Sequence, residues 1–130
     1  PDIAILEYNA VLGAQRAITV PYRPDFVRQQ AHPSFLYYGA SLGALIELGR
    51  CKGYRFVGCN SAGNNAYFVH GDAMTPALDE LASSARFVES RFRESRDARG
   101  ELDYLQGAAR YQRIRGLPVV NTTTGELEAL

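Results

Sequence analysis

The sequence is poor in the residues that build metal, redox and phosphate sites. It has two cysteines and two histidines in 130 residues, and no tryptophan. Cys51 and Cys59 form no CxxC pair and have no histidine at ligand spacing, so we interpret them as free thiols. His32 and His70 are too few for a metal site without carboxylates at matching spacing. Neither GxGxxG nor GxxxxGK[ST] occurs, so the chain by itself holds no phosphate-binding loop.

The chain also lacks an excess of charge of one sign and a long hydrophobic run. Fourteen basic and fourteen acidic residues give a formal net charge of zero, which argues against a nucleic-acid-binding protein. No apolar stretch approaches the roughly 18 residues that a membrane helix needs, and the first residues show no signal peptide. We therefore expect one ordinary globular domain in the reducing cytoplasm, without a membrane partner.

Residues 3–6 form an unbroken apolar run, which predicts a strand covered on both faces in a parallel sheet. Glu7 and Asn9 follow at its carboxyl end, the edge at which ligands bind in open α/β sheets. We therefore name both as candidate catalytic residues. The alternative is that they hydrogen-bond and hold the backbone of the long irregular stretch 10–33. Loops of that length are uncommon in compact domains and are usually functional.

Apolar residues within 42–49 recur at helical spacing, which predicts a helix that begins near Ser41 and ends before Gly53. Residues 54–60 and 65–70 are typical of two strands, and the turn residues between them favour an antiparallel hairpin. Together with the first strand, these elements predict a strand–helix–strand unit with an antiparallel edge.

Residues 39–43 have the sequence GASLG, which matches the nucleophile elbow of α/β-hydrolases. The partners of a catalytic serine do not fit. Only His70 follows Ser41, and the one carboxylate between them, Glu47, lies on the helix that follows the serine and cannot orient that histidine. We therefore interpret Ser41 as the N-cap of the helix.

The chain after about residue 73 differs in character. Thr75 and Pro76 predict the start of a helix over 76–82, and a short helix over 106–115 and an extended segment at 117–120 should follow. From Asn121 onward we expect a frayed end. Between these elements lies an arginine cluster interleaved with acids, which we interpret as an internally paired surface, the alternative being a contact to RNA or phosphate. Its arginines are Arg86, Arg91, Arg93, Arg96 and Arg99.

Several segments of the chain resemble one family. They are IAILEYNAVLG, ITVPY, FLYYGASLGALIELGRCKGYRFVGCNSAGNNAYFVHGD, SRFRESRDARGELDYL and IRGLPVV. Together they are similar to the C-terminal half of bacterial FkbM-like proteins, which have a class I S-adenosylmethionine-dependent methyltransferase fold. The resemblance covers nearly the whole chain.

The resemblance implies a partial Rossmann-like α/β sheet, in which residues 3–8 are the fifth strand and the hairpin supplies the last two, one of them antiparallel. It implies S-adenosylmethionine for the complete protein, held by elements that this chain does not contain. The methyl acceptor, a small molecule or a glycan, would lie across the carboxyl edge of the sheet. The candidate residues are Glu7 and Asn9 for catalysis and Tyr37, Tyr38, Asn60 and Asn65 for substrate binding.

We therefore expect two parts, an α/β half-domain over 1–72 and a helical and irregular extension over 73–130 that packs on it. The exposed edge of the first strand should pair with the missing N-terminal half or with a second copy. The leading hypothesis is a methyltransferase fragment that is inactive alone. The alternatives are a non-catalytic α/β module that dimerises or pairs through its sheet edge, and an RNA-associated domain that uses residues 86–99.

Overall fold

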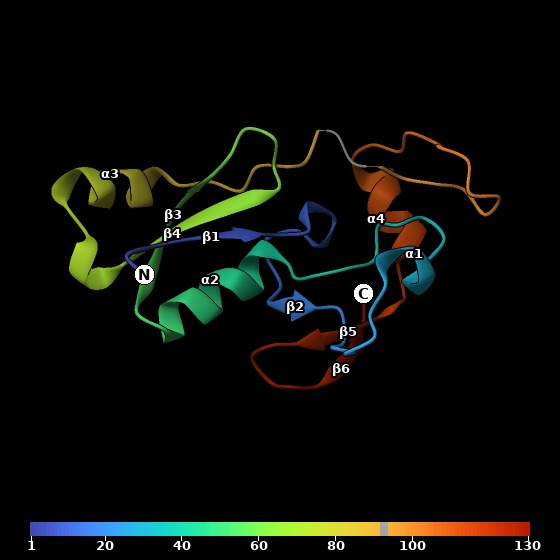
Figure 1. Cartoon of the computed structure of the whole chain (residues 1–130), viewed down its shortest axis with the longest axis horizontal. Coiled ribbons are helices and arrows are strands. Elements are labelled where there is room, and N and C mark those ends of the chain that lie inside the picture. Colours follow the sequence, from blue (N-terminus) through green and yellow to red (C-terminus); the bar gives the residue numbers. More distant parts are fainter. Residues whose placement is uncertain (92–93) are drawn as a thin grey trace.

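The computed structural model describes residues 1–91 and 94–130 and has an α/β architecture with two small antiparallel sheets (Figure 1). In the first sheet, the strands lie in the order β1 (Ile3–Glu7), β4 (Asn65–His70) and β3 (Tyr54–Cys59). In the second, the order is β2 (Ile18–Thr19), β5 (Pro118–Asn121) and β6 (Leu127–Ala129). The α/β class is thus confirmed.

The helix that links β1 to β3 begins where its capping residue predicts. α2 (Leu42–Cys51) starts after Ser41, whose Oγ accepts from the amide of Ala44 at 3.1 Å and from that of Ile18 at 3.1 Å. The same hydroxyl donates to the carbonyl of Arg16 at 2.7 Å and is fully buried. Because its hydrogen-bonding capacity is used, Ser41 is the predicted N-cap.

The order of strands in the first sheet corrects one prediction. Both β1 and β3 pair antiparallel with β4, so they run in the same direction, and the antiparallel strand lies in the centre of the sheet and not at its edge. The reason lies in composition: β4 contributes Ala66, Phe68 and Val69, all of them buried, whereas β3 carries Arg55. The more apolar strand of the hairpin takes the more buried position.

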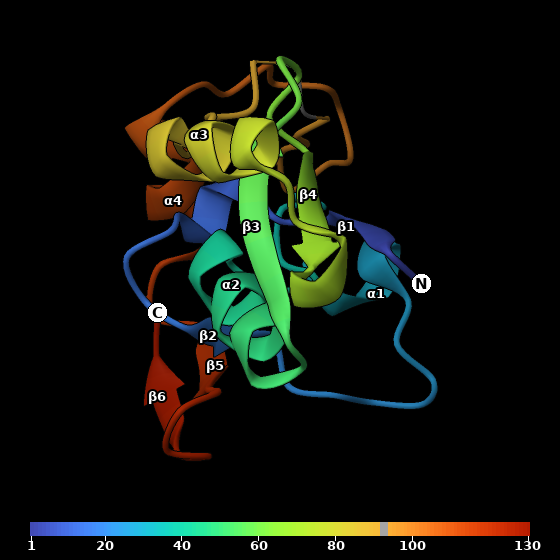
Figure 2. The ribbon, with the colours of Figure 1, turned by 90° about the vertical axis from the view of Figure 1, so that its left-hand side faces the viewer.

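The expected burial of β1 on both faces was also wrong. Ala4 and Leu6 pack on the cluster beneath α2, but Ile3 and Ile5, which point to the other face, are 59% and 58% exposed. The predicted parallel sheet would have covered both faces. Here α2 covers one face, and α3 (Pro76–Ser84) lies against β3, where Asp79 pairs with Arg55. Figure 2 shows β1 at the opposite side of the sheet from β3.

Two groups of buried residues hold the elements together. One lies between α2 and the first sheet and is built around Tyr8, Leu42 and Phe68. The other joins segments from both ends of the chain, and β2 pairs with β5 across the predicted boundary at residue 72. Its buried members are Leu12, Ile18, Val20, Leu36, Tyr37, Ile114, Val119 and Leu130.

The C-terminal segment is ordered, so the prediction of a frayed end from Asn121 was wrong. β6 pairs with β5, the amide of Leu130 donates to the carbonyl of Leu117 at 2.9 Å, and the side chain of Leu130 is 7% exposed. The physical reason is that the apolar Leu130 enters the second core group, which a count of polar residues along the tail does not reveal.

The remaining elements are short. η1 (Ala10–Leu12) and α1 (Arg28–Ala31) lie within the stretch predicted to be irregular. η2 (Gly71–Ala73) precedes α3, which is capped by Thr75 as predicted. α4 (Ala108–Ile114) lies within the helix predicted over 106–115.

Two arginines of the cluster pair with neighbouring acids among the described residues. Arg96 contacts Glu94 at 2.6 Å, and Arg99 contacts Glu101 at 3.1 Å. Arg93 lies outside the described residues. For Arg96 and Arg99 these pairs agree with the predicted internal pairing, whereas Arg86 donates to the backbone carbonyls of Ser83 and Ala85.

We predict that replacing Ser41 by alanine destabilises the fold. Two buried amides and one partly buried carbonyl lose their partner, so the free energy of unfolding should fall by about 2 kcal/mol. Urea denaturation followed by circular dichroism measures this change. Ser84→Ala, an exposed serine at the end of α3, is the control and should change stability by less than about 0.5 kcal/mol. Equal effects of the two substitutions would contradict the assigned role of Ser41.

Candidate functional site

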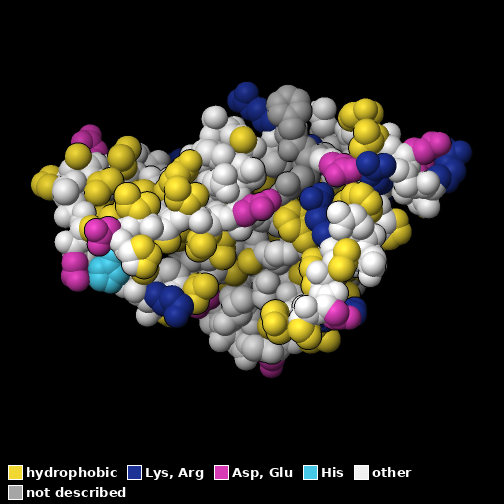
Figure 3. All heavy atoms as spheres, viewed as in Figure 1, with side chains coloured by type: hydrophobic (Ala, Val, Ile, Leu, Met, Phe, Trp, Pro, Cys, Tyr) yellow, Lys and Arg dark blue, Asp and Glu magenta, His cyan; other side chains and the backbone are white. Residues whose placement is uncertain are grey.

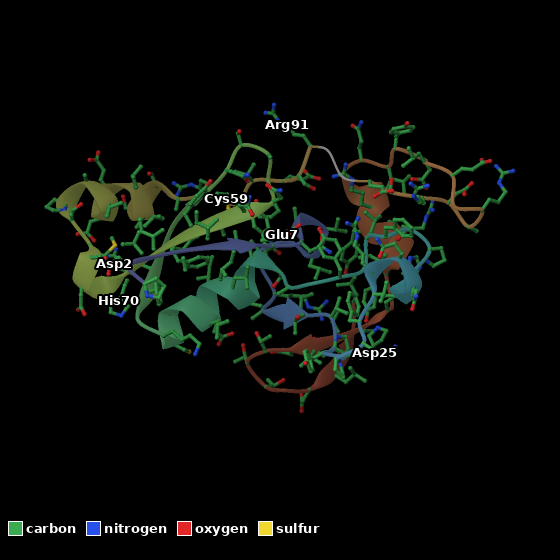
Figure 4. All side chains as sticks on the ribbon, viewed as in Figure 1. Asp2, Glu7, Asp25, Cys59, His70 and Arg91 are labelled. Carbon is green, nitrogen blue, oxygen red and sulfur yellow. The ribbon has the colours of Figure 1, made fainter. Side chains whose placement is uncertain are left out.

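The carboxyl end of β1 brings together two of the six candidate residues. Glu7 is exposed at the end of this strand and lies directly opposite Asn65 of β4 in the antiparallel register. Paired residues of neighbouring strands point to the same face of a sheet, so Glu7 and Asn65 share the face that α2 does not cover. Figure 4 shows Glu7 at the opposite end of the sheet from His70.

Asn9 is buried and serves the backbone. Its Nδ2 donates to the carbonyl of Leu36 at 2.8 Å and to that of Tyr38 at 2.9 Å, and its Oδ1 accepts from the amide of Val11 at 3.1 Å. The residue is 1% exposed. These contacts match the alternative prediction for this position, in which the side chain holds the following loop in place.

The two candidate tyrosines have different surroundings. Tyr37 is buried in the second core group, and its hydroxyl donates to the carbonyl of Pro118. Burial raises the pKa of Tyr37. Tyr38 is half-buried, with the guanidinium of Arg28 4.6 Å from the centre of its ring. Of the two, Tyr38 is the one with a partly exposed side chain.

Asn60 shapes the hairpin turn. Its Oδ1 accepts from the amides of Asn64 and Asn65, each at 3.1 Å, and its Nδ2 donates to Oδ1 of Asn64 at 2.7 Å. An asparagine that accepts from amides a few residues on is a standard device for closing a turn. This turn places Asn65 at the start of β4.

Sequence analysis missed the role of Tyr8. The residue is fully buried, its hydroxyl donates to the carbonyl of Val88 at 2.5 Å, and its ring lies 6.0 Å from that of Phe87. Burial, with a further contribution from the Cys59 thiol, raises the pKa of Tyr8. Tyr8 therefore ties the chain after α3 to the carboxyl end of β1. The only signal in the sequence is its position between Glu7 and Asn9.

The segment that Tyr8 anchors forms one wall of a groove. A cavity of about 860 Å³ is lined by residues 87–91, Gln106 and Gly107. It shares Phe87, Glu89 and Ser90 with a smaller cavity of about 180 Å³ that reaches η1 and α4. The groove thus opens near the carboxyl end of β1 and presents a carboxylate, an amide and an aromatic ring, which are groups that orient a polar organic molecule.

Arg110 joins the two walls of the groove. It is 3% exposed, its Nη1 donates to the carbonyl of Ser90 at 2.6 Å, and its Nε donates to the carbonyl of Leu105 at 2.7 Å. Both are charge-assisted hydrogen bonds, which are stronger than bonds between neutral groups. The shape of the groove therefore depends on this buried guanidinium.

The GASLG turn leaves no room for a ligand beside its backbone. In the GASLG turn, a Cβ on Gly43 would lie 2.7 Å from the carbonyl oxygens of Ala14 and Arg16, so backbone fills the space that a ligand would need. No group of three or more histidine, cysteine or acidic side chains converges in the part of the chain that the structure describes. The same part contains no helix with the length and hydrophobicity to span a membrane.

Comparison with known proteins adds no relative. No family model matches the chain, and neither a curated protein nor a solved structure matches it. The resemblance to FkbM-like methyltransferases therefore stays a prediction that rests on the quoted sequence segments.

We predict that Asn9→Asp destabilises the chain at neutral pH. A carboxylate would face the carbonyls of Leu36 and Tyr38 in place of an NH₂ donor, so the free energy of unfolding should fall by more than about 2 kcal/mol. Urea denaturation measures it. The control is Asn64→Asp, where the side-chain oxygen already accepts from Asn60 and a carboxylate keeps that bond. A loss at position 64 as large as that at position 9 would refute the assigned role.

His32 should make stability depend on pH. Its Nδ1 accepts from the amide of Ser34 at 3.2 Å, and burial, with a smaller contribution from Arg113, lowers its pKa below the ordinary 6.5. Below about pH 6.5 the unfolded chain therefore binds more protons than the folded one, and the free energy of unfolding falls as the pH falls.

This dependence can be measured by urea denaturation at about pH 7.5 and about pH 5.5. His32→Asn, whose Oδ1 can accept from the amide of Ser34, should lose less stability over that interval than the unmodified chain. An equal loss in both proteins would show that other groups cause it.

Proposed function

We propose that the chain is the C-terminal half of an FkbM-like class I methyltransferase-fold protein, active only when β1 is joined to the half that holds S-adenosylmethionine. The observation that carries this proposal is the arrangement of the first sheet. β1 and β3 run in the same direction, α2 connects them, and the last strand of the hairpin is antiparallel to both. The resemblance implies these features for the fifth and later strands of that fold.

The open side of β1 supports the same proposal. No strand pairs with this side of β1 among the described residues, and Ile3 and Ile5 are largely exposed. A sheet that continued beyond β1 would satisfy the outward backbone groups and, with a helix above it, cover the two isoleucines. An apolar strand such as IAILE is typical of the interior of a sheet.

In this proposal the cofactor is held outside this chain. The GASLG turn is filled by backbone, and the sequence contains neither of the glycine-rich motifs that cradle phosphates. S-adenosylmethionine supplies the electrophilic methyl group when it is bound, and in this proposal the other half of the protein holds it. We therefore derive only what the residues of this chain do toward the acceptor.

Glu7 is the best placed of the candidate catalytic residues. It ends β1 on an exposed face, next to Asn65, so the carboxylate and the amide together can orient an acceptor hydroxyl or amine by hydrogen bonds. Asn9 is a positioning residue, because it holds the loop that carries Tyr38. The groove lined by Phe87, Glu89 and Gln106 suits a polar small molecule or a glycan as the acceptor.

A second candidate function is a non-catalytic interaction module that pairs through its sheet edge. The specific observation in its favour is that Asn9, Tyr37 and Asn60 hydrogen-bond within the chain. Half of the candidate site residues therefore build the fold. In either case we assign the protein to the cytoplasm, where the free thiols of Cys51 and Cys59 stay reduced.

The proposal predicts that S-adenosylmethionine binds only to a longer protein. Isothermal titration calorimetry should show no binding to residues 1–130 alone and micromolar binding to the longest product of the same reading frame. Tight binding to residues 1–130 would overturn the proposal. Absence of S-adenosylmethionine binding to the longest product would also overturn the proposal. The interaction module would then be the favoured function.

In that longer product, Glu7→Gln should lower methyl transfer by about 100-fold and leave cofactor binding unchanged, because the carboxylate acts on the acceptor. Asp72→Asn is the control, since the side chain of Asp72 is 97% exposed in η2. An unchanged rate in the Glu7 variant would remove Glu7 from the mechanism. An equal loss of rate in the Glu7 and Asp72 variants would also remove Glu7 from the mechanism.

A further inference from the structure

The two edges of the first sheet differ in how they are protected. At β3, the register shifts between Phe56 and Gly58, Arg55 pairs with Asp79, and α3 lies alongside. A bulge, a charged side chain and a covering helix are the devices by which proteins block unwanted strand pairing. β1 has an unbroken register with β4 and contains no proline or basic residue.

The backbone groups that β1 offers to a partner follow from its pairing. The carbonyl of Asp2 accepts from the amide of His70 at 2.8 Å, and the amide of Tyr8 donates to the carbonyl of Asn64 at 2.9 Å. Because hydrogen-bonded residues alternate along an antiparallel strand, the even-numbered residues face β4. Ile3 and Ile5 therefore direct their amides and carbonyls outward, and no described residue bonds them.

The side chains beside this edge are apolar. Ile3 and Ile5 are 59% and 58% exposed on the face opposite α2. Figure 3 shows hydrophobic side chains gathered over the half of the molecule in which Figure 1 places β1. The edge therefore combines directional backbone groups with exposed apolar surface, which is the combination that strand addition uses.

We propose that a second copy of this chain pairs with β1, antiparallel and about a two-fold axis, with Ile3 opposite Ile5 of the second copy. This inference deepens the second candidate function by naming the partner, and it does not depend on methyl transfer. In this register the outward groups of Ile3 and Ile5 meet their counterparts in two hydrogen-bonded pairs. The four isoleucines gather on one face, and Ala4 lies opposite Ala4 at the centre, where strands approach most closely.

Charge and closure both favour a second copy as the occupant. Asp2 and Glu7 lie at opposite ends of β1, so an antiparallel copy places Asp2 across from Leu6 and brings no two carboxylates face to face. In a two-fold dimer both β1 edges are paired. The protected β3 edges then prevent further copies from adding to the sheet. A pair of five-residue strands buries less than the roughly 1,200 Å² of a standard interface, so we expect a micromolar dimer.

Sedimentation velocity of residues 1–130 over a range of concentrations tests the proposal. The unmodified chain should pass from monomer to dimer, and Ile5→Lys should weaken the association at least about tenfold, because it places two ammonium groups within the interface. Leu81→Lys is the matched control: Leu81 is 54% exposed on α3, away from β1, and its variant should associate like the unmodified chain.

Hydrogen exchange identifies the strand that pairs. The amides of Ile3 and Ile5 should gain protection as the concentration rises, whereas those of Ala4 and Leu6, which bond β4, should be protected throughout. A monomer at all concentrations overturns the proposal, as does a dimer that Ile5→Lys leaves intact or an aggregate of no fixed size. These measurements use no cofactor, so a monomeric result does not contradict the methyltransferase proposal. Conversely, a failure to bind S-adenosylmethionine does not contradict the dimer proposal.

Discussion

The structure depends on the central position of β4. This strand hydrogen-bonds β1 on one side and β3 on the other, so it sets their common direction, and its Phe68 packs against Gly49 of α2. With β4 in the centre, β1 becomes an edge strand whose outward backbone groups and isoleucines face solvent. The sheet order therefore decides both where a ligand edge lies and where another chain can pair.

The carboxyl end of β1 is held by buried polar contacts from distant segments. Asn9 bonds the loop before α2, and Tyr8 bonds the chain after α3, so two segments far apart in sequence meet at one place. Such contacts are costly to break because each leaves a buried group unpaired. They fix the walls of the groove, while Glu7 stays exposed at the end of β1.

Local signals were sufficient for the elements that depend on neighbouring residues. Ser41 and Gly53 bound α2, and the turn at 61–64 gives the hairpin, because caps and tight turns are made by residues close in sequence. The candidate site was predicted less completely. Asn9 and Tyr37 were named for chemistry, but burial gives them backbone partners that no local pattern contains.

The sequence by itself determined the α/β class, the capped helix and the hairpin, since hydrophobic periodicity and turn residues act over a few positions. Only the tertiary structure decided that β4 lies between β1 and β3, that the C-terminal strand enters a core group, and that β1 is open on one side. These outcomes depend on which apolar faces meet across the whole chain, and that is a competition among distant segments.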